Sequence, residues 1–512
     1  MKPIKMMAGF MTVGFWTLMS RVLGFVRDIL IASYLGTGPV AEAFLVAFSL
    51  PNMFRRFFAE GAFNMAFVPM FSKKLEGGDD AKGFAEDAMS GLAGILIVFT
   101  VIAHFAMPWL VLAMASGFVG DERFDLAVFF GRIAFPYILF ISISALLSGV
   151  LNATGRFAAA AAAPVLLNIL LVGGMVMASQ LGWDIGTTLA ITVPIAGIAQ
   201  MMLVWVAASR AGFRLVPRRP QMTPDLKRLL IIAAPAALAG GVVQVNLLVG
   251  RQVASHFEGA VAWLSYADRL YQLPLGVVGI AVGIVLLPDL SRRLRAKDYE
   301  GSREALSRAG DVSMALTIPA AVALIVIPIP LVNVLFERGA FTTDDTAATA
   351  AAVAVYGLGL PAFVLQKLLQ PVYFARENTK TPFYFAVVAM LINAAIAIGL
   401  APFLQFWAAA LATTVAGWAM VLMLAIGARR YGDVARFDRA FWRRCVRTII
   451  ASLIMGVCLW FSSLMLGPLF GAGGPKALGL IILIAIGIVS YFGIGHLIGA
   501  FRLGDFRAAM RR

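Results

Sequence analysis

Eight basic residues interrupt the long apolar runs of this 512-residue chain. An arginine at the centre of a bilayer costs at least ~2.5–3.5 kcal/mol, so residues of this kind face a wet cavity, pair with acids or reach the membrane interface. The planar guanidinium fork is suited to phosphate, which it binds through two parallel hydrogen bonds. The pattern therefore favours recognition of an anion inside a membrane. The eight residues are Arg21, Arg27, Arg55, Arg56, Arg132, Arg251, Arg269 and Lys367.

Four acidic residues lie within the same runs or at their ends, and they are too few to neutralise eight cations. A cavity lined by these groups is predicted to be net positive. Two local pairs are an alternative interpretation: Arg56 with Glu60 at i, i+4, and Asp268 beside Arg269. Arg21 lies about 16 Å into its run at 1.5 Å per residue, which is mid-bilayer depth. The acids are Asp28, Glu42, Glu60 and Asp268.

The composition indicates which elements position these charges. Hydrophobic residues make up 61% of the chain, charged residues 13%, and the mean hydropathy is +0.88. At ~20 residues per span, fourteen spans leave only short connections and no large soluble domain. We predict an all-α, polytopic membrane protein of 14 transmembrane helices. The predicted spans are 10–35, 41–72, 84–112, 124–153, 159–181, 186–209, 229–256, 261–291, 309–335, 345–375, 382–402, 406–428, 446–468 and 477–500.

The basic residues outside the spans predict the orientation. With the N-terminus inside, the inside segments hold 31 Lys and Arg and the outside segments hold three. This asymmetry follows the positive-inside rule and predicts that both termini are cytoplasmic. It also accounts for most of the net charge of +15 without a nucleic-acid partner.

Weak internal similarity predicts a repeat. "IASY" at 31–34 matches "VASH" at 253–256, and "FVPMFSKK" at 67–74 resembles "LLPDLSRR" at 286–293, at offsets of 222 and 219 residues. Six spans fit in that offset, so the repeat is predicted to be parallel. The expected organisation is an N-terminal lobe (1–220, spans 1–6), a C-terminal lobe (221–440, spans 7–12) and an appended pair of spans (441–512).

Other chemistries lack a signature. The two cysteines, Cys445 and Cys458, have neither zinc-site nor disulfide-framework spacing, and the three histidines are scattered. No phosphate-binding loop of the G-x-x-x-x-G-K-[ST] type occurs. We therefore expect no metal, no cofactor and no enzymatic activity; coupling to the membrane potential or to an Na⁺ or H⁺ gradient stays open.

Three segments resemble one known family. They are "SRVLGFVRD" (20–28), "FSLPNMFRRFFAEGAFNMAFVPMF" (48–71) and "YADRLYQLPLGVVGIAVGIVLLPDLS" (266–291). They resemble the bacterial lipid II flippase family MurJ, also called MviN, of the multidrug/oligosaccharidyl-lipid/polysaccharide exporter superfamily. The resemblance runs from end to end of the chain and includes the 14-span count.

The resemblance implies two lobes that alternate access and move the peptidoglycan precursor lipid II, an undecaprenyl-pyrophosphate disaccharide-pentapeptide, to the outer leaflet of the cytoplasmic membrane. It implies that residues 441–512 form a groove for the lipid tail. It places the substrate-binding arginines at Arg21, Arg27, Arg55 and Arg269, and functional acids at Asp28, Glu60 and Glu42.

The sequence also leads to expectations about the partners of the protein and leaves alternative functions open. The expected partners are lipid II and membrane lipids, with the cell-wall synthesis machinery as a candidate and a monomer favoured. An exporter of another polyprenyl-linked glycan or of drugs, and a polyprenyl-phosphate membrane enzyme, are the alternative functions. A cationic-drug exporter should have an acidic cavity, which counts against that reading.

Overall fold

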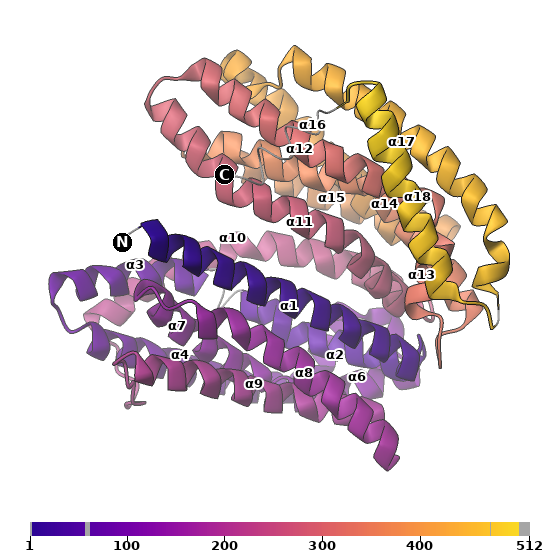
Figure 1. Cartoon of the computed structure of the whole chain (residues 1–512). Coiled ribbons are helices and arrows are strands. Elements are labelled where there is room, and N and C mark those ends of the chain that lie inside the picture. The colour runs from indigo at the N-terminus through magenta and orange to yellow at the C-terminus, as the bar shows by residue number, and fades with distance from the viewer. Residues whose placement is uncertain (1–2, 57–61, 472, 501–512) are drawn as a thin grey trace. The chain divides into compact units, whose positions relative to one another are not determined.

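The computed structural model describes residues 3–56, 62–471 and 473–500, and every regular element in these ranges is helical (Figure 1). The first ten α-helices are α1 (Pro3–Leu35), α2 (Pro39–Arg55), α3 (Ala62–Gly77), α4 (Ala81–Phe105), α5 (Met107–Met114), α6 (Glu122–Ala134), α7 (Tyr137–Ala153), α8 (Ala158–Leu181), α9 (Ile185–Arg210) and α10 (Pro224–Ser255). The others are α11 (Ala260–Arg295), α12 (Tyr299–Val326), α13 (Pro328–Phe336), α14 (Thr343–Phe374), α15 (Lys380–Leu404), α16 (Trp407–Ala428), α17 (Arg439–Met465) and α18 (Lys476–Leu497). Short 3₁₀ helices are η2 (Ser116–Phe118), η3 (Arg429–Ala435) and η4 (Gly467–Phe470).

Each of the fourteen predicted spans corresponds to one helix or to two consecutive helices, which confirms the all-α, polytopic fold class. Within the described residues, nine helices are long and apolar enough to cross a membrane, or ten if the bent pair α6–α7 counts as one span. The predicted span 41–72 corresponds to α2 and α3, and residues 57–61 between them lie outside the described part of the chain.

Proline accounts for the breaks that divide three of the spans. Pro108 follows the break between α4 and α5, and Pro328 follows the break between α12 and α13. Pro136 stands at the 41° bend between α6 and α7. Proline has no backbone N–H and its ring clashes with the preceding turn, so a helix ends or bends there.

The helices repeat along the chain. Helix α2 begins at Pro39 and α11 at Ala260, 221 residues later, and α6 and α14 begin with the same offset, at Glu122 and Thr343. The broken span α4–α5 has its counterpart in α12–α13. Even the start of these spans is the same, because an aspartate caps a glycine N–H in each: Asp80 with Gly83, and Asp298 with Gly301.

Contacts divide the chain into two compact units. Unit 1 comprises residues 1–262 with the tetrapeptide 338–341, and unit 2 comprises residues 263–337 and 342–512. In unit 1, α8 packs against both α1 and α9, α2 against α6, and α10 against α3. In unit 2, α16 packs against α14 and α15, while α12 packs against α14 and α17. The three-part lobe organisation 1–220, 221–440 and 441–512 stays a prediction.

The tetrapeptide 338–341 packs on the end of α1 through backbone-to-backbone contacts. The Ala340 N–H donates to the Ser33 carbonyl at 2.8 Å. Gly36 has φ of +62°, and a Cβ there would lie 2.5 Å from the Ala340 carbonyl oxygen. Glycine is therefore required at Gly36 both for its backbone conformation and for this close approach.

Candidate functional site

Arg27 and Asp28 form a buried polar cluster with a residue from a distant helix. The Arg27 Nη2 and Nε groups donate to Asp28 Oδ1 at 2.7 and 3.0 Å, and Nη1 donates to Asn168 Oδ1 at 3.0 Å. Arg27 and Asp28 are 7% and 5% exposed. The Arg27 guanidinium also lies 5.7 Å from the Phe48 ring centroid, which adds a cation–π contact. The cluster ties α1 to α8 and α2 inside unit 1.

Asn168 was not singled out from the sequence, although it is central to this cluster. Its Nδ2 donates to the Ser20 carbonyl at 3.0 Å and to the Pro164 carbonyl at 3.3 Å. The amide lies against α1 at Gly24, where a Cβ would be in ordinary van der Waals contact with the Asn168 amide nitrogen, at 3.5 Å. The available signal in the sequence was a polar amide in the apolar helix α8, one turn after the helix-internal Pro164.

Glu42 lies at a second buried charge cluster. It is fully buried, pairs with Arg123 Nη1 at 2.9 Å and accepts the Val261 N–H at 2.9 Å. Arg123 also pairs with Asp121 at 2.6 Å and stacks on Phe118 at 4.5 Å. Arg123 is one of the three basic residues that the charge distribution predicts in outside segments; it is a buried residue in the first turn of α6. This cluster connects α2, α6 and the start of α11.

Two predicted substrate arginines of unit 1 are more accessible. Arg21 is exposed on α1, and Arg55 is half-buried at the end of α2. Glu60, the predicted acid nearest to Arg55 in sequence, lies outside the described residues. Accessible guanidinium groups at the predicted depth are suited to contact a ligand, whereas Arg27 is engaged by protein groups.

The other two predicted charges belong to unit 2. Arg269 is exposed on α11, and the half-buried Asp268 accepts a hydrogen bond from Gln272 one turn later. Tyr271 stacks at 5.0 Å on Tyr356 of α14, so this turn of α11 is anchored by aromatic packing. A cavity shared by Arg269 and the arginines of unit 1 stays a prediction.

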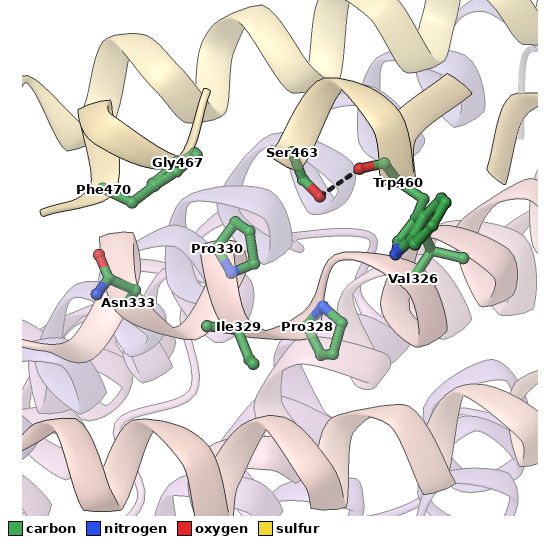
Figure 2. Close-up of a pocket in the computed structure, with 9 residues that line it drawn as sticks. All are labelled: Val326, Pro328, Ile329, Pro330, Asn333, Trp460, Ser463, Gly467 and Phe470. Carbon is green, nitrogen blue, oxygen red and sulfur yellow. Dashed lines mark hydrogen bonds between the residues drawn. The ribbon is translucent and has the colours of Figure 1, made fainter. Parts of the chain in front are cut away.

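An apolar pocket of about 320 Å³ lies in unit 2 at the break between α12 and α13 (Figure 2). The C-terminal part of α17 and η4 form its other wall, so the appended helices contribute to it. Its lining residues are Val326, Pro328, Ile329, Pro330, Asn333, Trp460, Ser463, Gly467 and Phe470. The predicted tail groove in 441–512 is not tested by this pocket.

An ion pair beside the pocket attaches α18 to the rest of unit 2. Glu337 accepts hydrogen bonds from Lys476 Nζ at 3.0 Å, Asn333 Nδ2 at 2.8 Å and Thr346 Oγ1 at 2.8 Å. Burial opposes ionisation of Glu337, but the hydrogen bonds from Thr346, Lys476 and Asn333 outweigh it and hold its pKa below the ordinary value.

No group of three or more histidine, cysteine, aspartate or glutamate side chains that could hold a metal occurs among the residues that the structure describes. The two buried clusters of unit 1 consist of arginines, carboxylates paired with them and the neutral Asn168 amide. Such an arrangement can bind and release an anion by hydrogen bonds and charge.

The fold is that of a class of polytopic, all-helical membrane proteins. A multidrug resistance MATE family transporter of the MOP superfamily in an inward-facing conformation has a TM-score of 0.67, covers 81% of this chain and 95% of its own, and is 15% identical, so it shares the fold. A solved lipid II flippase MurJ in an inward closed conformation has a TM-score of 0.81 and 27% identity, covering 95% of this chain and 98% of its own.

The sequence comparisons give the particular family. Residues 31–472 match the family described as lipid II flippase MurJ. Probable lipid II flippases MurJ from Rhizobium tropici and Rhizobium meliloti strain 1021 are 43% and 44% identical, each covering 98% of this chain and 96% of its own length. The chain belongs to the lipid II flippase MurJ family, a family of transporters, and is a multi-pass protein of the bacterial inner membrane.

Proposed function

We propose that this protein flips lipid II from the inner to the outer leaflet of the cytoplasmic membrane by alternating access through a cationic cavity. The observation that carries the proposal is the family match over residues 31–472. The relatives' name supplies the substrate, and the arginines within the spans supply the chemistry that a pyrophosphate needs. The lipid is moved without covalent change, so no catalytic residue is expected.

The charged head of lipid II explains why the cavity should be cationic. Moving a pyrophosphate through hydrocarbon without compensation is prohibitive, because a charge loses its hydration there. Arg21 and Arg269 are exposed, and Arg55 is half-buried. Their guanidinium groups can replace the lost water, while the polyprenyl tail stays in the bilayer or in a groove of the C-terminal pair.

Several finer features belong to the same proposal. Both termini are cytoplasmic, as the 31-to-3 distribution of basic residues favours. The membrane potential can contribute to transport, since one charge crossing 100 mV is worth ~2.3 kcal/mol, and an Na⁺ or H⁺ gradient is an alternative source. The protein acts as a monomer without a metal or other cofactor, and the cell-wall synthesis machinery is a candidate partner.

The experiment compares Ala and Lys variants of Arg21, Arg55 and Arg269 in a depletion strain. Each Ala variant is expected to lose growth support at near-normal membrane abundance, and Lys is expected to rescue at most one site because it lacks the bidentate fork. Lipid II should accumulate on the inner leaflet when the protein is depleted.

Arg27→Ala is the matched comparison, because it breaks the buried cluster with Asp28 and Asn168 and should lower abundance. Loss of abundance in all three cavity variants would contradict substrate binding, and full rescue by every Lys variant would reduce their role to bulk charge. Accumulation of a different polyprenyl-linked glycan would identify a different substrate.

A further inference from the structure

In unit 2, two arginines flank one tyrosine at the place where α14 and α16 end and α15 begins. The Arg376 guanidinium carbon lies 4.6 Å from the Tyr431 ring centroid, and that of Arg430 lies 4.8 Å from it. Arg376 follows the end of α14, and Arg430 and Tyr431 belong to η3, directly after α16. Asn378 and Thr381, at the start of α15, complete a group of five residues that we call the Arg–Tyr cluster.

The side chains of the Arg–Tyr cluster supply more hydrogen-bond donors than they use among themselves. The Tyr431 hydroxyl accepts from Arg430 Nη2 and from Asn378 Nδ2, both at 2.8 Å. The Thr381 hydroxyl accepts from the same two groups at 2.9 and 3.1 Å. Each hydroxyl still has its own proton to donate. The cluster therefore offers two cations and two hydroxyl donors to an acceptor.

Among the side chains that the structure describes, neither cation has a carboxylate partner. In the described part of the chain no ion pair involves Arg376 or Arg430; Arg376 Nη1 donates only to the Val372 carbonyl, at 2.6 Å. The neighbouring Glu377 is exposed, and no ion pair joins it to either arginine within the same ranges. By contrast, Arg293 at another helix end pairs with Asp289 at 2.9 Å.

The pKa values of Arg293 and Arg376 are shifted in opposite directions, as expected if Arg293 has an acidic partner and Arg376 has none. Hydrogen bonding to Asp289 raises the pKa of Arg293, whereas burial lowers the pKa of Arg376. A half-buried guanidinium that retains its charge without an acid gains most from an anionic ligand.

The position of the cluster favours a lipid ligand over a soluble one. It lies where the apolar spans Thr343–Phe374, Lys380–Leu404 and Trp407–Gly432 begin or end, so it is at headgroup depth. Span Lys380–Leu404 has only 17% of its apolar window buried, so most of this window is free to face lipid. Phe383 and Tyr384, 38% and 63% exposed, form the aromatic belt expected at an interface.

We propose that the Arg–Tyr cluster binds the phosphate group of an acidic phospholipid in the leaflet that faces the basic loops. Arg376 and Arg430 contact the phosphate oxygens, and the hydroxyl groups of Tyr431 and Thr381 donate to them. The site is separate from the predicted cavity residues, so it does not depend on which substrate the protein transports.

The test is a native mass spectrometry titration of the full-length protein with phosphatidylglycerol, and with phosphatidylcholine as the lipid without net charge. The double variant Arg376→Gln, Arg430→Gln is compared with Arg219→Gln, Arg439→Gln, which removes the same charge from exposed arginines. Loss of two charge-assisted contacts should weaken phosphatidylglycerol binding at least about tenfold, and the control should leave it nearly unchanged.

A charge-preserving variant and a competition with inorganic phosphate separate lipid binding from misfolding and from binding of free phosphate. Arg376→Lys, Arg430→Lys preserves the charge and should bind with intermediate affinity, which covers the case in which the Gln variant fails to fold. Inorganic phosphate at ~10 mM, about the concentration at which a millimolar ligand saturates, should not displace the lipid. Equal loss of binding in the Gln pair and the control, or equal retention of phosphatidylcholine, would overturn the site. Displacement by inorganic phosphate would overturn the lipid as its ligand.

Discussion

At the scale of single residues, the buried Glu42 and the exposed Arg21 and Arg269 differ in how far they are held by neighbouring groups. Glu42 has no exposed surface and holds both Arg123 and the Val261 N–H. Its surroundings are those of a structural charge, because loss of its carboxylate would leave the buried Arg123 with Asp121 as its remaining acidic partner and the Val261 N–H without its acceptor. Arg21 and Arg269, in contrast, are exposed.

This contrast predicts the behaviour of Glu42→Gln. The substitution keeps the shape of the side chain but removes one of the two carboxylate charges that face Arg123, so the free energy of unfolding should fall by about 1.5–3 kcal/mol. The measurement is denaturant unfolding of the purified protein in detergent. Glu304→Gln, which breaks the exposed i, i+4 pair with Arg308, is the control and should change stability by less than about 1 kcal/mol. Equal effects of the two variants would contradict a structural role for Glu42.

The sequence indicated which cations lie inside the membrane but not what each of them contacts. Arg27 and Asp28 are adjacent in sequence, so their proximity was expected, whereas the third member, Asn168, comes from 141 residues away. Such a partner depends on which helices pack together, and helical periodicity carries no information about that. Arg123 was missed because a charged residue near a predicted boundary is assigned to a loop by default.

At the scale of elements, the appended helix α18 is attached to α13 and α14 by one charged contact. Glu337 receives Lys476 from the start of α18 and Thr346 from α14. Polar groups at the ends of apolar helices of this kind fix their position where lipid-facing side chains cannot.

The attachment should depend on pH. The folded-state pKa of Glu337 lies below its ordinary value of 4.5, so its contribution is present above that pH and is lost as the pH falls through the folded-state value. Glu337→Gln should therefore lower stability at pH 7, by about 1.5–3 kcal/mol for a charged hydrogen bond, and by less near pH 4.

Thermal unfolding of both proteins at the two pH values measures the difference. A gap between wild type and variant that stays constant from pH 7 to pH 4 would exclude the ionised carboxylate as its cause. Thr346→Val, which removes one donor and leaves the charge, should have a smaller effect at pH 7.

The spans themselves were predictable at this scale, but their interruptions were not. An apolar run reads the same whether the helix is continuous or broken, so 84–112 and 309–335 were each expected as one element. The structure divides them at Ala106 and Ile327. The nearby prolines were the available signal, and proline within an apolar segment is compatible with both outcomes.

At the scale of the whole molecule, the distribution of basic residues and the repeat are independent indications of one topology. The repeat offset of 221 residues contains six spans, and an even number preserves orientation. The sequence therefore carried the fold class, since periodicity, charge asymmetry and repeat offset are properties of the chain alone.

The topology predicts the outcome of thiol labelling. In a background without Cys445 and Cys458, Val119→Cys and Asp344→Cys should react with an impermeant reagent added outside. Arg214→Cys and Glu300→Cys should react only after the membrane is opened. All four positions are exposed, so a lack of reaction would reflect the membrane side rather than burial. Labelling of Val119→Cys and Glu300→Cys from the same side would contradict the fourteen-span topology.

The Glu42 cluster also has a consequence for how the chain is made. Arg123 is synthesised 81 residues after Glu42, and the Val261 N–H only 219 residues after it. At ~5–20 residues per second, these partners emerge from the ribosome about 4–16 s and about 10–40 s later. For that interval the second span carries a carboxylate whose hydrogen bonds are incomplete. Unit 1 therefore cannot finish folding until the start of α11 has been translated, and a nascent chain that stalls before Val261 lacks the backbone donor that completes the hydrogen bonds of Glu42.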